Sequence, residues 1–133
     1  MSADPIFAAT PKQGGGAVAS ADASYTGPTN VATLITAPAS GTRVERARFV
    51  FTGTTSLAGF VNVFVHDGTN YRLIRSIPYT AITASVTVQP ALTDGSGQIT
   101  FEGGLILPSG YSLRASFTNG TGQLVGTCDA ADF

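Results

Sequence analysis

The sequence predicts an all-β protein, a single antiparallel β-sandwich that is jelly-roll-like and has an extended N-terminal arm. Its length of 133 residues suffices for one domain with one core. Apolar and polar residues alternate along most of the chain, and no window of 11 or more residues keeps the helical period. Glycine-rich turns separate the alternating runs at intervals of about 8–12 residues, which is typical of sandwiches and barrels.

Residues 1–16 are predicted to form an extended arm that ends in a hinge, and residues 17–133 to form the sandwich. Ile6 and Phe7 lie between Pro5 and Pro11, and proline favours extended backbone in the residue before it. Three consecutive glycines, Gly14 to Gly16, favour a flexible joint over the inside of a strand. A frayed terminus is the alternative interpretation.

The strands are predicted from runs of β-branched and aromatic residues with a period of two. Asp67-Gly68 between two such runs indicates a hairpin, because glycine accepts a positive φ without a steric clash. The predicted strands are 31–36, 44–52, 60–66, 71–77, 85–88, 98–102, 111–118 and 124–128.

The predicted core comes from the inward positions of these strands. The run at 60–66 is apolar on both faces, so we expect another subunit or an arm to cover its second face. The core is predicted to include Phe49, Phe51, Val61, Val63, Val65, Leu73, Leu113 and Phe117.

Composition argues against several classes of function. Seven basic and eight acidic residues give a net charge of −1, so we expect no nucleic-acid partner and no membrane-surface partner. One cysteine and one histidine cannot form a disulfide framework or a zinc site within one chain, and no cofactor is predicted. The N-terminus lacks the pattern of a signal peptide and no run is long enough to span a membrane, so we expect synthesis in a cytoplasm.

Few residues are candidates for catalysis or for thiol chemistry. His66-Asp67 is the only His beside a carboxylate, but the sequence has no Gly-x-Ser-x-Gly nucleophile elbow, so we expect no enzyme and interpret His66 as a strand-end residue. Cys128 is interpreted as a small apolar residue, with a disulfide to another chain as the alternative.

Arg46 and Arg48 share one face of a predicted strand and form the main concentration of charge with Arg43 and Glu45. Arginine binds carboxylates through two parallel hydrogen bonds, so these two residues are candidate contacts to another subunit. The alternative is the solvated face of an edge strand, where charges prevent unwanted pairing.

Several segments, in this order, carry a resemblance to a known group: Pro5–Pro11, Arg43–Phe49, Thr52–Thr55, His66–Asn70, Ile77-Pro78, Ile82-Thr83 and Leu107–Ala115. Together they resemble small virion structural proteins of tailed bacteriophages. The resemblance extends from about residue 5 to residue 117, and its specificity lies in the order of the segments.

This resemblance implies a non-enzymatic capsid decoration, or cement, protein on the virion surface that binds the major capsid protein and stabilises the head. It also implies a homo-oligomer, with a trimer first. The arm residues themselves add an expectation: an isolated arm cannot bury Ile6 and Phe7, so we expect residues 1–13 to dock on the major capsid protein or an adjacent subunit by strand addition. One alternative is a structural protein of the collar, tail or fibre. A second is a carbohydrate-binding β-sandwich module, for which the chain, without tryptophan, supplies few aromatic residues.

Overall fold

The structure, a computed structural model, describes residues 10–52, 54–55, 57–81, 83, 85 and 98–133. This part of the chain forms eight strands and no helix, which confirms the predicted all-β class. It therefore also holds no helix that is long and apolar enough to cross a membrane. The strands are β1 (Thr10–Val18), β2 (Ala32–Thr36), β3 (Thr42–Phe51), β4 (Gly59–His66), β5 (Tyr71–Tyr79), β6 (Gln98–Leu107), β7 (Ser112–Phe117) and β8 (Leu124–Asp132).

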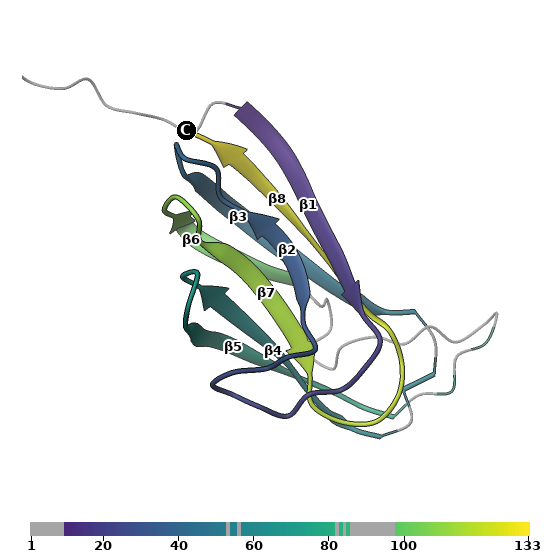
Figure 1. Ribbon diagram of the computed structural model, residues 1–133. Helices are drawn as coiled ribbons and strands as arrows, with labels where there is room; N and C mark the ends of the chain where they lie inside the picture. Colours follow the sequence, from purple (N-terminus) through teal and green to yellow (C-terminus); the bar gives the residue numbers. More distant parts are fainter. Residues whose placement is uncertain (1–9, 53, 56, 82, 84, 86–97) are drawn as a thin grey trace, which may run out of the picture.

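The strands form two antiparallel sheets that pack face to face (Figure 1). Sheet A has the order β1-β8-β3-β6 and sheet B the order β2-β7-β4-β5. The first strand pairs with the last, the second with the seventh, the third with the sixth and the fourth with the fifth. This nested pairing is the topology of an eight-stranded jelly roll, so the predicted sandwich type is confirmed.

Strand β1 corrects the predicted arm and hinge. Gly14 to Gly16 lie inside this strand, which pairs with β8 in continuous register from Thr10↔Asp132 to Val18↔Leu124. Glycine is used here for close approach, because a Cβ on Gly16 would lie only 2.6 Å from the Thr33 carbonyl oxygen of β2. A Cβ on Gly14 would collide with the Leu34 carbonyl oxygen. Residues 1–9, with Ile6 and Phe7, lie outside the described residues.

The core between the sheets contains most of the predicted residues. Leu73 is the exception, with 41% of its surface exposed. A β-bulge in β5 carries the register from Val63↔Arg75 to Phe64↔Leu73, so the alternation reverses and Leu73 faces away from the core. Val65 packs partly buried against the core. The predicted residues that are fully enclosed are Phe49, Phe51, Val61, Val63, Leu113 and Phe117.

The outer face of β4 is partly covered by the chain itself. Phe64 is fully buried and meets the Tyr71 ring edge-on, with the ring centroids 5.5 Å apart. Phe60, on the same face of the strand, keeps 45% of its surface exposed. Phe64 is therefore covered within its own chain without another subunit, and the expectation of a subunit or an arm over this face stays a prediction for Phe60.

Several element boundaries differ from the sequence-based expectation. The predicted hairpin is confirmed, with Gly68 at φ +100° and the Asp67 carboxylate accepting from the backbone N–H groups of Thr69 and Asn70. Strand β6 continues beyond residue 102 through a bulge that contains Gly103 and Gly104, both at positive φ. The strand expected at 85–88 lies outside the described residues, apart from Ser85.

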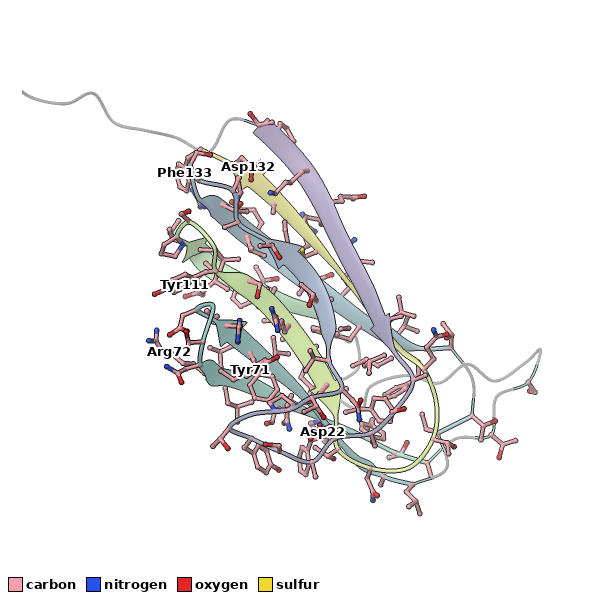
Figure 2. The ribbon with its side chains drawn as sticks, in the orientation of Figure 1. Asp22, Tyr71, Arg72, Tyr111, Asp132 and Phe133 are labelled. Carbon is pink, nitrogen blue, oxygen red and sulfur yellow. The ribbon has the colours of Figure 1, made fainter. Side chains whose placement is uncertain are left out.

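The connection from β1 to β2 is organised by one carboxylate. It passes from sheet A to sheet B at the end of the sandwich opposite Asp132 and Phe133 (Figures 1 and 2). Asp22 accepts hydrogen bonds from the N–H groups of Ser24 (3.0 Å), Thr29 (2.8 Å) and Asn30 (3.2 Å). Its own N–H donates to the Phe117 carbonyl at 2.8 Å, which attaches the connection to β7. Backbone hydrogen bonds from Ser24 and Thr29 lower the pKa of Asp22 from its usual 3.8.

The close contact between β1 and β2 predicts a position-specific effect of adding one methyl group. We expect Gly16→Ala to lower the free energy of unfolding by about 1–3 kcal/mol, because the Cβ would overlap the Thr33 carbonyl. Gly27→Ala is the matched control, since no atom lies within 4 Å of its added Cβ. Urea denaturation measures the free energy of unfolding of both variants. Equal losses of stability in Gly16→Ala and Gly27→Ala would contradict the close contact between β1 and β2.

The lowered pKa of Asp22 predicts a pH dependence. Because the folded pKa lies below the unfolded one, the ionised carboxylate stabilises the fold above about pH 4, and this contribution is lost as the pH falls through the folded pKa. We expect Asp22→Asn to be less stable than the wild type by about 1 kcal/mol at neutral pH. The variant should lose less stability between about pH 5 and pH 2, as thermal melting would show. Parallel curves for the two proteins would refute this role.

Candidate functional site

The main polar cluster of the described surface lies on the outer face of sheet A. Arg46 and Arg48 on β3 both approach Asp129 on β8, with Arg46 Nε at 3.1 Å and Arg48 Nη2 at 3.3 Å from Asp129 Oδ2. Gln13 on β1 donates from Nε2 to Asp129 Oδ1 at 3.1 Å. Three strands thus position one carboxylate between an amide and two guanidinium groups.

The sheet register explains why these side chains meet. Arg46 and Gln13 both lie directly opposite Asp129, one on each side of β8, and Arg48 is two residues beyond Arg46 on the same face. The edge-strand interpretation of these arginines is wrong, because β3 lies between β8 and β6. We call Gln13, Arg46, Arg48 and Asp129 the sheet A cluster.

A second ion pair lies farther along this sheet. Lys12 Nζ is 2.6 Å from Asp132 Oδ1, and the Thr42 hydroxyl donates to the same oxygen at 2.6 Å. The hydrogen bonds from Lys12 and Thr42 lower the pKa of Asp132, so this carboxylate stays ionised. The face is therefore nearly charge-balanced, and its side chains are held in fixed positions by one another.

The sheet A cluster is open to partners. Arg46 and Arg48 keep 45% and 49% of their side-chain surface exposed. A shallow hollow of about 550 Å³ lies beside Arg46 and Asp129 and is also lined by Pro11, Lys12, Gln13 and Ala130. Arg46 binds Asp129 through Nε, and its two terminal nitrogens have no hydrogen-bond or ion-pair partner within the described part of the chain. Such nitrogens can bind a carboxylate of another protein.

His66 belongs to a packed aromatic group at the start of β5. Its ring centroid lies 4.4 Å from that of Tyr71, and its Nδ1 accepts a 3.3 Å hydrogen bond from the Gly68 N–H. Arg114 donates to the Tyr71 hydroxyl at 2.8 Å and to Ser112 Oγ at 2.9 Å (Tyr71 in Figure 2). This arrangement supports the interpretation of His66 as a strand-end residue.

Asp67 does not orient His66 as a catalytic carboxylate would. Its oxygens accept from the turn amides of Asn70 and Thr69 and pair with Arg72, and the two amide hydrogen bonds lower its pKa. Within the described ranges, no group of three or more His, Cys, Asp or Glu side chains could hold a metal ion.

Cys128 lies inside the sandwich. It is 1% exposed, faces Gly14 of β1, and has its thiol pKa raised by burial. The alternation of β8 places it on the inner face, next to the outward-facing Asp129. The interpretation of Cys128 as a small buried apolar residue is supported, since a disulfide to another chain would require the sheets to separate.

Sequence reasoning missed Asp129 and Gln13 as members of the cluster. The period-two pattern places Asp129 on the outer face of its strand, which was the only available signal. Gln13 was assigned to the extended arm that precedes the Gly14–Gly16 hinge, so its place beside Asp129 could not be inferred. The pairing of β3 with β8 joins residues about eighty positions apart, and no local pattern encodes it.

No family model matches the chain, and no curated protein matches it either. Among solved structures, the chain is similar to an exo-β-1,3-galactanase from Phanerochaete chrysosporium in complex with galactose, at 17% sequence identity and a TM-score of 0.40. The match covers 93% of this chain but only 28% of the galactanase chain.

The burial of Cys128 predicts slow thiol chemistry in the native state. We expect a thiol reagent such as dithionitrobenzoate to modify it at least about a hundredfold more slowly in buffer than in denaturant, because reaction requires opening of the sandwich. Thr127→Cys in a Cys128→Ala background provides an exposed thiol on the same strand as a control. Rapid native modification of Cys128 would contradict the assigned position.

Proposed function

We propose that the protein is a non-enzymatic structural protein of a tailed-bacteriophage virion, made in the host cytoplasm, that decorates the capsid by binding the major capsid protein. The resemblance of its ordered sequence segments to such proteins is the starting point. The observation that carries the proposal is the sheet A cluster, a set of side chains held in place on the open face of a four-stranded sheet.

The shape of this face suits a protein partner. Small-molecule sites are typically concave and bury most of their ligand, whereas this hollow lies open beside a sheet face. Arg46 and Arg48 are already restrained by Asp129, so less side-chain entropy is lost when a partner binds them. Arginine is also enriched among the residues that dominate protein–protein binding energies.

Several copies would bind a symmetric capsid more tightly than one. A homotrimer, as the resemblance implies, would present three such faces to equivalent sites on the head, and linked weak contacts then add by avidity. The alternative location in the collar, tail or fibre would use the same face on a different virion protein.

Copy number separates these locations. Cryo-electron microscopy of virions should show the sandwich at every equivalent capsid position if the protein decorates the head. Density confined to the tail or collar would support the alternative, and absence of the protein from purified virions would overturn the proposal.

The role of the sheet A cluster can be tested by binding to heads that lack the protein. We expect the double variant Arg46→Ala, Arg48→Ala to bind at least about tenfold more weakly, which corresponds to about 1.4 kcal/mol. Arg72→Ala is the matched control, because Arg72 is an exposed arginine with one ion pair, to Asp67, at the β4–β5 hairpin. Melting temperatures confirm that both variants fold. Equal binding of the wild type, the double variant and Arg72→Ala would show that the sheet A cluster does not contact the capsid.

A further inference from the structure

We propose that the groove between β5 and β6 binds the N-terminal segment, residues 1–9, of a second copy of this chain. The groove is where the sandwich is open between its two outer edge strands, β5 of sheet B and β6 of sheet A. This inference concerns self-association and does not depend on attachment to a capsid.

The two long edges of the sandwich are built differently. At one edge, Gly14 and Gly16 let β1 lie directly against the backbone of β2. At the other edge, a groove of about 360 Å³ lies between β5 and β6. Its lining is Ile74, Arg75, Ile99, Thr100, Phe101, Glu102, Gly104 and Leu105.

The groove has the features of a docking site for an extended segment. Ile99 is buried in the core and Phe101 and Leu105 pack against it, so the floor is apolar. Strand β5 pairs only with β4, which leaves its outer edge without a described partner strand. A segment that adds to this edge gains main-chain hydrogen bonds and places alternate side chains in the groove.

The groove also contains an arginine, Arg75, that forms no ion pair with the described residues. Arg75 lines the groove and has no carboxylate partner in the described ranges, and Glu102 likewise has no cationic partner there. Residues 1–9 contain one charged side chain, Asp4, followed by the apolar pair Ile6 and Phe7. The groove thus holds one cation and one anion, and an acidic and then apolar segment complements its apolar floor and its Arg75 side, with Asp4 away from Glu102. Pro5 is compatible with a newly added edge strand.

The length of this segment points to a second copy. The N-terminal segment joins the sandwich at Thr10, the first residue of β1. Strands β8 and β3 lie between β1 and β6, so β1 and β6 are three interstrand spacings apart, about 14 Å, and the groove lies beyond β6. Ile6 is four residues before Thr10, so a fully extended chain carries it at most about 14 Å, and Phe7 less far. All of this reach would be used in crossing the sheet. Ile6 and Phe7 can therefore enter the groove of a neighbouring copy but not their own.

Cysteine cross-linking in the full-length protein tests this geometry. We expect the double variant Ile6→Cys, Ile74→Cys to form covalent oligomers under mild oxidation, with peptides joined between positions 6 and 74. The matched control is Ile6→Cys, Ile106→Cys, because Ile106 is 51% exposed on β6 but does not line the groove. Equal cross-linking of the two variants, or a disulfide within a single chain at positions 6 and 74, would overturn the proposal.

Charge reversal provides a second readout that requires no cross-link. We expect Arg75→Glu to weaken self-association at least about tenfold in analytical ultracentrifugation, and Asp4→Arg in the same chain to restore it. The variant Ile6→Ser, Phe7→Ser should lose association to a similar extent, whereas Ala8→Ser, Ala9→Ser should not. A wild type that stays monomeric at high micromolar concentration, or association that is insensitive to Arg75→Glu, would refute the groove as the site.

Discussion

The backbone contact between β1 and β2 is the constraint on which the shape of the molecule depends. Gly14 and Gly16 place no side chain between the two strands, so the sheets meet at this edge. Three glycines lose more conformational entropy on folding than other residues would. Continuous pairing with β8 offsets this loss and fixes the first described strand beside the last. Because one edge is closed by backbone, the opening between the sheets lies at the opposite edge, between β5 and β6.

The outer faces of the two sheets differ in how they satisfy their polar groups. On sheet A, the charges form a connected array around Asp129 and Asp132, and the arginines still reach solvent. On sheet B, the Tyr71 ring packs against Phe64, and its hydroxyl accepts a hydrogen bond from Arg114. The polar atoms of Tyr71 and Arg114 are thus already engaged with each other. Sheet A is for this reason the better surface for a rigid protein contact, although the chain carries few charges in total.

The two proposed contacts use separate parts of the fold. The sheet A cluster lies on the outer face of β1, β8 and β3, whereas the groove lies between the outer edges of β5 and β6. When the N-terminal segment of one copy binds the groove of the next, the contact is heterologous, because different surfaces meet. Such contacts generate a ring when the rotation that relates successive copies closes. A ring of this kind could keep the sheet A faces of its members available to a common surface, which would let the two contacts act together.

The all-β class, the hairpin at Asp67-Gly68 and the inward positions of β3, β4 and β7 could be predicted from the sequence, because each depends on alternation or turn chemistry within a few residues. The sequence could not determine that Gly14 to Gly16 form a strand, since glycine is equally suited to a hinge and to close packing, and only the presence of β2 decides between them. Leu73 was misplaced because a single bulge in β5 reverses the alternation. The sequence brought Arg46 and Arg48 to one face, but only the tertiary structure placed Asp129 and Gln13 beside them and opened the groove beside Arg75. Those arrangements depend on strand pairings between distant residues, which local patterns do not encode.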